Sequence, residues 1–293
     1  MKGYLVINHF LRTEKFEKLY EWLREAADRQ GVELITKTNV EMMSCIGGRE
    51  KPFFMDADFI LFWDKDIKLA KQLEAMGLRV FNKASAIENC DDKALTHIIL
   101  AKAGIRMPKT FAVPMTFPSI GYTEYSFLDT IEKELGYPMV VKECFGSFGQ
   151  QVYLCHNREE VLSRVSRQVI FQEFIEESFG RDIRIQIVGN KVVTAMYRYS
   201  ENGDFRANIS NGGKMRPYTP NEEQRELALA CVRALELDFA GVDILFDKED
   251  RPIICEVNSN AHFKNIYDCT GVNTADFIIE DIVQKITAEG GHV

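Results

Sequence analysis

The chain of 293 residues predicts an α/β fold of mixed α+β type, in which an N-terminal α/β domain precedes two further lobes. Over the first 88 residues, short apolar runs alternate with amphipathic helical patterns, which is typical of a small open α/β sheet. After residue 109 the runs are joined by tight turns, such as Gly189-Asn190 in a predicted hairpin. We therefore predict three parts: 1–88, 89–175 and 176–293.

In the first part, residues 3–8 read as a strand and residues 14–30 as an amphipathic helix. Phe16, Leu19 and Leu23 recur in that helix at intervals of three and four, and Gly31 ends it. The other elements predicted here are strands at 32–36, 58–63 and 79–81 and a helix at 67–76. Strands and helices that alternate in this way predict one open sheet covered by helices.

The second and third parts begin with a helix at 92–103, which Gly104 ends. Thr219-Pro220-Asn221-Glu222 predicts a later helix start, with a capping box and proline at the first position. The other predicted helices are 125–135, 158–165 and 273–287, and the predicted strands are 138–142, 152–155, 169–173, 183–188, 191–199, 241–246 and 253–258.

Composition excludes several classes of protein. The net charge is −8, with 44 acidic and 36 basic residues, which argues against nucleic-acid binding through clustered lysine and arginine. No apolar run approaches the roughly 20 residues that span a bilayer, so we expect no membrane segment. The seven cysteines are scattered without a Cys-x-x-Cys pair, which favours reduced thiols in a cytoplasmic protein over disulfides or structural zinc.

A possible magnesium site comes from the last predicted hairpin. Glu256 and Asn258 lie two residues apart on one strand and therefore point to the same face. Asp243 lies across the hairpin and can join them. Two carboxylates and an amide oxygen form the hard ligand set that Mg²⁺ prefers beside nucleotide phosphates. The alternative is that these are ordinary polar residues on the outer face of a strand.

A possible phosphate site comes from Lys142, which ends a predicted strand and precedes the loop 145–151. This loop contains Ser147 and Gly149, and its glycines can turn backbone N–H groups toward an anion. A lysine at the strand end adds a positive charge for a phosphate. The alternative is a plain hairpin turn, since the lysine precedes the glycines and the Walker pattern is absent.

Two further segments fit a nucleotide site. Gln172-Glu173-Phe174-Ile175 leaves an apolar strand, and its extended backbone can pair with an adenine edge, although apolar strand ends are common. Arg184 and Arg198 fall on the two strands of one hairpin, where cations can stabilise charge during phosphoryl transfer. The alternative for the arginines is a surface ladder of ion pairs with nearby acidic residues, namely Glu176, Glu177 and Glu201.

Taken in order, these segments form a more specific pattern than any one of them. From about residue 91 to 285 the chain resembles the ATP-grasp superfamily, and within it the RimK-type amino-acid ligases. The resemblance rests on Asp92-Lys93, Val140-Val141-Lys142, Gln172-Glu173-Phe174-Ile175, Asp182-Ile183-Arg184, Gly203-Asp204-Phe205-Arg206-Ala207-Asn208, Ala240-Gly241-Val242-Asp243 and Glu256-Val257-Asn258. It implies a pre-ATP-grasp α/β domain followed by a two-lobed ATP-grasp domain.

The resemblance also implies roles for individual residues. Those assigned to ATP are Lys93, Lys142, Ser147 and Gly149 for the phosphates, Glu173, Phe174 and Ile175 for adenine, Asp182 for ribose, and Arg206 and Asn208 beside the triphosphate. Those assigned to Mg²⁺, which Mn²⁺ can replace, are Asp243, Glu256 and Asn258. Arg184 and Arg198 would face the acyl substrate and, with Arg206, assist catalysis.

The chain departs from the RimK-type pattern after Asn258. RimK-type ligases usually continue with Ala-Ser-Pro-Gly, whereas this chain continues with Ser259-Asn260-Ala261-His262-Phe263-Lys264-Asn265. That ending is similar to the Phe-Lys-Asn of LysX-like ligases, which act in lysine biosynthesis. His262 either contacts substrate or relays a proton, or it is simply an exposed loop residue.

The resemblance implies an ATP-dependent carboxylate–amine ligase. An acylphosphate forms from the carboxylate, and an amine then displaces phosphate to give an amide. The expected partners are amino-acid or peptide substrates, such as glutamate, or a carrier-protein or other protein acceptor, and the enzyme is expected to be a homo-oligomer. Two alternatives stay open: a phosphotransferase on the same fold, and a nucleotide-binding module without catalysis.

Overall fold

The computed structural model of the chain describes residues 1–11, 13–48, 52–146 and 149–290. Its N-terminal sheet is parallel and has the strand order β2-β1-β3-β4. The strands are β1 (Lys2–Ile7), β2 (Glu33–Thr38), β3 (Phe59–Trp63) and β4 (Val80–Phe81). These elements confirm the α/β domain predicted from the alternating pattern.

Helices cover both faces of this sheet because its central strands, β1 and β3, carry buried apolar side chains on both faces. On one face α1 (Glu14–Arg29) packs Leu19 and Leu23 against Leu5 and Leu61. On the other face α2 (Ile67–Ala75) packs against the neighbouring positions of the same strands. Because β1 and β3 are parallel neighbours, their carboxyl ends lie at the same edge of the sheet.

Two helices connect the first sheet to the rest of the molecule. The first, α3 (Ala84–Asp91), was not predicted, and the predicted domain boundary at residue 88 lies inside it. Its N-cap residue is Lys83, whose side chain has no acceptor for the first backbone N–H groups, so the sequence carries no start signal there. In contrast, Asp92 caps α4 (Lys93–Lys102) by accepting from the amides of Ala94 and Leu95 at 2.8 and 3.3 Å.

A second, antiparallel sheet has the order β5-β8-β6-β7. Its strands are β5 (Thr110–Ala112), β8 (Val169–Glu173), β6 (Met139–Glu143) and β7 (Val152–Cys155). On one face, Val141 and Phe171 share a core with Leu128 and Ile131 of α5 (Phe127–Leu135), and α6 (Arg158–Leu162) adds Val161. The opposite face carries Val140, Lys142 and Gln172, which line a pocket.

The third sheet is antiparallel, with the order β11-β10-β9-β12-β13. Its strands are β9 (Arg181–Val188), β10 (Lys191–Tyr199), β11 (Lys214–Pro217), β12 (Phe239–Phe246) and β13 (Pro252–Asn258). One face packs Ile185 and Val242 against α7 (Glu222–Ala234). Because side chains alternate along a strand, the opposite face carries the polar residues Asp182, Arg184 and Asp243.

The start of α7 corrects one prediction. Asn221, rather than Thr219, is the N-cap residue, and its side chain accepts from the amide of Gln224 at 2.9 Å. The side chain of Gln224 in turn accepts from the amide of Asn221 at 3.0 Å, which completes the capping box. Pro220 therefore precedes the helix, and the box begins two residues later than predicted.

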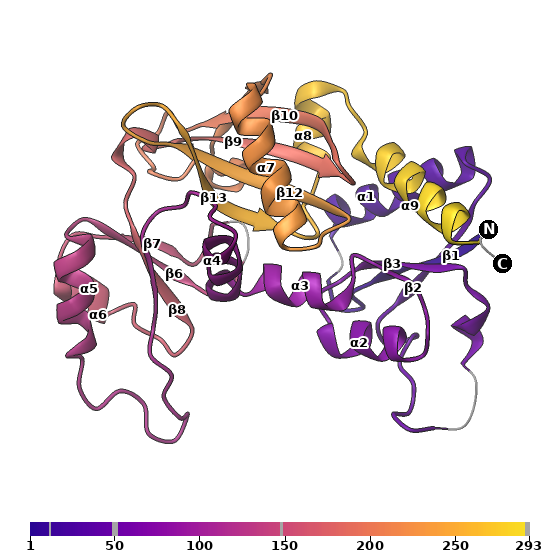
Figure 1. The fold of residues 1–293 in the computed structure, drawn as a ribbon, viewed down its shortest axis with the longest axis horizontal. Helices are drawn as coiled ribbons and strands as arrows, with labels where there is room; N and C mark the ends of the chain where they lie inside the picture. The colour runs from indigo at the N-terminus through magenta and orange to yellow at the C-terminus, as the bar shows by residue number, and fades with distance from the viewer. Residues whose placement is uncertain (12, 49–51, 147–148, 291–293) are drawn as a thin grey trace.

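The chain returns to its beginning through two final helices. These are α8 (Lys264–Thr270), which was not predicted, and α9 (Thr274–Gly290). Figure 1 shows α9 beside α1, and Ile278 and Ile282 share the core of the first sheet. Single 3₁₀ turns occur at η1 (Phe53–Asp56), η2 (Glu176–Ser178) and η3 (Ile209–Asn211).

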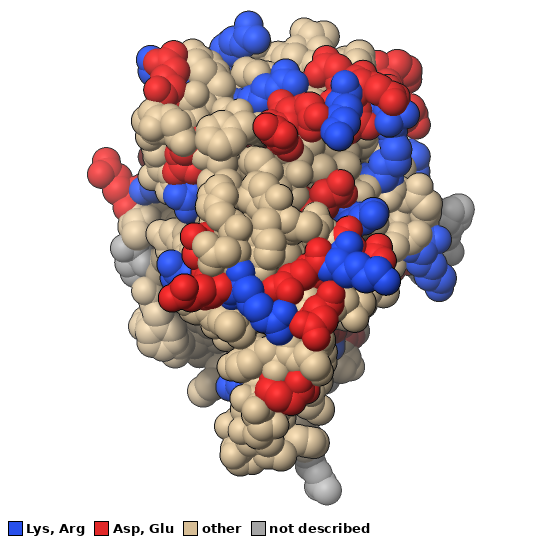
Figure 2. Space-filling model, turned by 90° about the vertical axis from the view of Figure 1, so that its left-hand side faces the viewer, with Lys and Arg blue, Asp and Glu red and all other residues tan. Residues whose placement is uncertain are grey.

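Acidic and basic side chains are interspersed on the face shown in Figure 2. Elsewhere in the chain, Arg158 of α6 lies 2.7 Å from both Asp129 and Glu132 of α5. Among the described residues, no helix combines the length and apolar character that a membrane span requires.

Candidate active site

Two adjoining pockets lie where the three sheets meet. The larger has a volume of about 480 Å³ and lies between the N-terminal domain and the third sheet. The smaller, of about 90 Å³, lies between the second and third sheets. Arg198, Asn208 and Glu256 line both pockets, so the two spaces meet at these side chains.

The structure brings together every described residue that the sequence assigns to the site. The smaller pocket is lined by Lys142, Gly149, Glu173, Phe174, Ile175, Asp182, Arg198, Arg206, Asn208, Asp243 and Glu256. The larger is lined by Lys93, Arg184 and Asn258, together with the shared residues. Ser147 lies outside the described residues.

The far end of the smaller pocket is formed by the end of β8. Glu173 is held in place by Lys109, whose amide donates to the Glu173 carboxylate at 3.1 Å. The ring of Phe174 meets those of Phe179 and Phe205 edge-on, with 6.3 Å between centroids in each pair. This aromatic group gives the pocket an apolar end of the kind that accepts a nucleobase.

Two cations hold the glycine loop against the site. Lys93 Nζ donates to the carbonyl of Gly146 at 3.1 Å, and Arg206 Nη1 donates to the carbonyl of Gly149 at 2.7 Å. Gly149 has a φ of +69°, and a Cβ there would lie 2.7 Å from Asn208 Oδ1. Glycine is therefore required at this point, both by the backbone and by the close approach of Asn208.

The hairpin of β12 and β13 places its polar residues through a β-bulge. Asp243 pairs with Glu256 and Ile244 pairs with Ile254, so Cys255 is the extra residue. Cys255 and Glu256 consequently both line the smaller pocket. Lys142 Nζ donates to the sulfur of Cys255 at 3.7 Å, which joins β6 to this hairpin across the pocket.

Asp243, Glu256 and Asn258 fit the hard ligand set predicted for magnesium. Asp243 lies directly opposite Glu256, and Asn258 follows on the same strand. The side-chain nitrogen Nδ2 of Asn258 is buried and has no hydrogen-bond partner among the described residues. The orientation of the Asn258 side-chain amide is therefore not set by a hydrogen bond from this nitrogen. The described residues contain no group of three His, Cys, Asp or Glu side chains arranged for a metal, so a site at Asp243 and Glu256 would need the amide oxygen of Asn258 as a third protein ligand.

A buried network of ion pairs lies beneath this set. Arg198 donates to both oxygens of Asp182, at 2.6 and 2.8 Å, and lies 3.0 Å from Asp243. Arg184 donates to both oxygens of Asp243. Burial alone would raise the pKa of Asp243, but Arg184 and Arg198 hold that pKa below its usual value.

This network decides against the surface ladder considered for the arginines. Arg198 is 4% exposed, and its partners are Asp182 and Asp243 rather than glutamates on the surface. The position of the Arg184 side chain also explains why residue 241 is glycine. A Cβ at Gly241 would lie 3.2 Å from the Arg184 side chain and 2.5 Å from the Cβ of Ala261. The lack of a side chain at Gly241 leaves room for Arg184 to reach Asp243.

Comparison with known proteins agrees with this geometry. Residues 90–282 match the model of the RimK-like ATP-grasp domain. The chain belongs to the RimK-like ATP-grasp family. It is accordingly an ATP-dependent carboxylate–amine ligase that forms a carbon–nitrogen bond and acts on an amino-acid substrate.

Relatives of this ligase are similar over most of its length. It is 37% identical over 246 residues to the "Uncharacterized protein MG012 homolog" of Mycoplasma pneumoniae, covering 82% of the chain and 84% of that protein. It is 35% identical to the ribosomal protein bS6–L-glutamate ligase of Escherichia fergusonii, covering 75% of the chain and 72% of that protein. It is 33% identical to human N-acetylaspartylglutamate synthase A, covering 68% of the chain but only 51% of the human protein.

Solved structures share the fold at low sequence identity. D-cycloserine synthetase DcsG superposes with a TM-score of 0.75 at 14% identity, covering 98% of this chain and 100% of that one. A RimK domain ATP-grasp protein from Sphaerobacter thermophilus superposes with a TM-score of 0.71 at 18% identity, covering 96% of this chain and 99% of that one. These matches confirm the predicted arrangement of an α/β domain followed by an ATP-grasp domain.

One residue that positions the site was not predicted. His97 lies on α4, one turn after Lys93, and its Nδ1 lies 2.7 Å from the carbonyl of Lys93. Its Nε2 lies 2.9 Å from the side-chain nitrogen of Gln172 on β8. These contacts fit a neutral ring with its proton on Nδ1, and burial lowers the pKa of His97 to about 4.

The buried His97 predicts a loss of stability in mild acid. The folded pKa of about 4 lies below the ordinary value of 6.5, so the unfolded chain binds more protons between these values. The contribution of His97 to stability is therefore complete well above pH 6.5 and falls as pH drops toward 4, by about 2 kcal/mol between pH 7 and pH 5. Urea unfolding at the two pH values should show a smaller difference for His97→Gln. The same change at the exposed His156 should leave the difference intact.

The structure shows that His262 is partly buried and is not simply an exposed loop residue. Its Nε2 lies 3.1 Å from the carbonyl of Lys15, and its Nδ1 accepts from the amide of Lys264 at 3.4 Å. The ring meets Phe16 edge-on at 5.1 Å, and burial lowers its pKa to about 4. Both ring nitrogens are thus engaged, and His262 joins the loop after Asn258 to α1 at the wall of the larger pocket.

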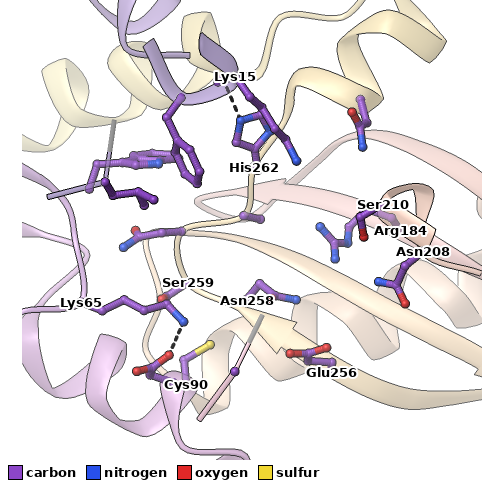
Figure 3. Close-up of a pocket in the computed structure, with 18 of the residues that line it drawn as sticks. Lys15, Lys65, Cys90, Arg184, Asn208, Ser210, Glu256, Asn258, Ser259 and His262 are labelled. Carbon is purple, nitrogen blue, oxygen red and sulfur yellow. Dashed lines mark hydrogen bonds and ion pairs between the residues drawn. The ribbon is translucent and has the colours of Figure 1, made fainter. Parts of the chain in front are cut away.

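Figure 3 shows how these residues surround the larger pocket of the ligase. Lys15 and His262 lie on one side of it, across from Glu256 and Asn258. Arg184 lies near Asn208, at the end that leads to the smaller pocket. The larger pocket thus has access to the same carboxylate, Glu256, that borders the smaller one.

Proposed function

We propose that this ligase activates an amino-acid carboxylate with ATP and joins it to an amine, with L-glutamate as one of its two substrates. The observation that carries the proposal is the junction of two pockets at Arg198, Asn208 and Glu256. ATP in the smaller pocket would present its terminal phosphate at this junction. A carboxylate held in the larger pocket could then attack that phosphate directly.

In this proposal each end of the smaller pocket holds one part of ATP. Glu173, Phe174 and Ile175 would bind adenine at the aromatic end, and Asp182 would bind ribose. The phosphates would lie near the junction of the two pockets. The residues that would surround the phosphates there are Lys93, Lys142, Gly149, Arg206 and Asn208. Lys93 and Arg206 would exchange their loop carbonyls for phosphate oxygens, which are stronger partners for a cation.

Asp243, Glu256 and Asn258 would hold Mg²⁺, and Mn²⁺ would suit the same oxygen ligands. A bound divalent ion neutralises charge on the phosphate that is transferred. Arg184 and Arg198 would keep Asp243 ionised and oriented for this role. A carboxylate has about four acceptor positions, so Asp243 can keep these bonds and still bind a metal.

Glutamate is proposed because the names of relatives and the charges that line the larger pocket both favour an acidic amino acid. Several relatives have glutamate or glutamyl products in their names, including the "Probable alpha-L-glutamate ligase" of Parasynechococcus marenigrum, which is 33% identical to this chain. The larger pocket is lined by Lys15 and Arg184, which favour a carboxylate-bearing substrate. Burial, together with Arg184 and Lys264, lowers the pKa of Lys15, and a bound carboxylate would reverse that effect.

The second substrate is proposed to be an amino acid or the end of a peptide, since the larger pocket has a volume of about 480 Å³. A carrier protein or another protein acceptor would enter through such a terminal segment. All seven cysteines are free thiols, which fits an enzyme that works in the reducing cytoplasm.

A screen of amino-acid pairs tests this function. ADP release would be measured with ATP, Mg²⁺ and glutamate plus each second amino acid or dipeptide, and mass spectrometry would detect the product. We expect ADP release that depends on both substrates, with free phosphate and an amide of glutamate. A phosphorylated product would indicate a phosphotransferase, and a failure of every substrate pair to release ADP would contradict the proposal.

A further inference from the structure

The N-terminal domain forms one wall of the larger pocket. Asn8 and Asp64 directly follow β1 and β3, and both line the pocket. Because β1 and β3 are parallel, these residues meet at the carboxyl edge of the sheet. This edge is where ligands bind in open α/β sheets.

Asp64 is a buried carboxylate without an ionic partner among the described residues. It is 8% exposed, and Asn8 Nδ2 donates to its two oxygens at 3.1 and 3.2 Å. The amide of Lys65 donates to Oδ1 at 2.7 Å, while the ammonium of Lys65 pairs with Asp91 instead. Oδ2 therefore keeps capacity for a further donor. Burial raises the pKa of Asp64, which shows that its negative charge is not fully compensated.

Asn260 supplies a second acceptor at the same place. Its Nδ2 donates to the backbone carbonyl of Asp64 at 3.0 Å, which fixes the orientation of the amide beside Asp64. Its Oδ1 is buried and has no hydrogen-bond partner in the described part of the chain. A buried acceptor that lacks a partner costs free energy, so a donor from a ligand would be favourable here.

We propose that Asp64 and Asn260 bind an ammonium group of the carboxylate substrate, so that this substrate is an amino acid or peptide with a free amine. The inference rests on the proposed function of the larger pocket. An ammonium group offers three donors and no acceptor, which matches one carboxylate and one amide oxygen. The amine that attacks the acylphosphate must be uncharged, so the ammonium at Asp64 is a group that does not react.

The inference excludes a class of substrates. An amino acid acylated on nitrogen, or a polycarboxylate without an amine, would leave Asp64 buried and unpaired. A site built to bind a charged donor discriminates strongly against a ligand that lacks it. Human N-acetylaspartylglutamate synthase A, by its name, makes a product with an acetylated amine, so the two enzymes would differ in this subsite.

The test uses hydroxylamine to trap the activated carboxylate, which removes any dependence on the second substrate. The wild-type enzyme would be compared on an amino acid and on its N-acetyl derivative. We expect kcat/KM to favour the free amino acid by about 100-fold. In Asp64→Asn this preference should fall to within a few-fold, through a higher KM for the amino acid and with the KM for ATP unchanged.

Asp58→Asn is a matched control, because Asp58 is exposed and lies just before the start of the same strand. This variant should keep the wild-type preference. The inference is wrong if the wild-type enzyme uses the N-acetyl derivative equally well, a result that stands whether or not Asp64→Asn folds. It is also wrong if folded Asp64→Asn keeps the full preference. If the wild-type enzyme activates no carboxylate at all, the proposed function itself fails.

Discussion

Replacing Glu256 by glutamine is expected to lower the rate of ligation at least about 100-fold without unfolding the protein. Glu256 lies at the junction of the two pockets, opposite Asp243, and 3.5 Å from Lys93 Nζ. Glutamine keeps the size of the side chain but removes the charge that would hold the metal and orient Lys93. The kcat for ADP release at saturating substrates is the measurement, with thermal unfolding to confirm the fold.

Glu249→Gln provides the control for this variant. Glu249 lies in the turn of the same hairpin, where it is exposed and pairs with Arg251. Its replacement should leave kcat unchanged. If the loss in Glu256→Gln comes from the metal, raising the Mg²⁺ concentration should restore part of the rate. Near-normal ligation by Glu256→Gln would refute the assignment of Glu256 to the metal site.

The parts of the site that could be predicted are those with a local pattern. Glu256 and Asn258 are two residues apart on an apolar strand, so their shared face follows from strand geometry alone. Arg184 and Arg198 could likewise be placed on one face of a hairpin. The register confirms this, since Asp182 pairs with Arg198 and Arg184 pairs with Met196.

What escaped prediction depends on contacts between distant residues. His97 meets Gln172 across 75 positions, and Asn8 meets Asp64 across 56. Neither pair leaves a periodic trace in the sequence, because each depends on how separate sheets and helices pack. The burial of Arg198 could not be predicted either. The alternation of polar and apolar residues along β9 and β10 places Arg198 on the polar face, but it does not show that other parts of the chain cover that face. The helix α3 was missed for a different reason, since its start lacks a capping side chain.

Replacing Arg198 by methionine is expected to lower the free energy of unfolding by about 3–5 kcal/mol. Methionine can fill much of the space of the arginine stem but leaves Asp182 without its partner. Asp243 keeps Arg184, so the cost arises mainly at Asp182, whose two oxygens both accept from Arg198. Urea unfolding at pH 7 measures the loss, and Arg251→Met, at an exposed ion pair with Asp247, should change stability little.

A second substitution separates lost charge pairing from lost packing. If the cost of Arg198→Met comes from an unpaired Asp182, then adding Asp182→Asn should recover part of the stability, because a neutral amide is cheaper to bury than an unpaired carboxylate. If the cost comes from packing alone, the second change should lower stability further. An Arg198→Met protein as stable as Arg251→Met would show that the buried network contributes no more than an exposed pair. The network would then serve mainly to orient Asp243 for the metal, and the variant should lose activity without losing stability.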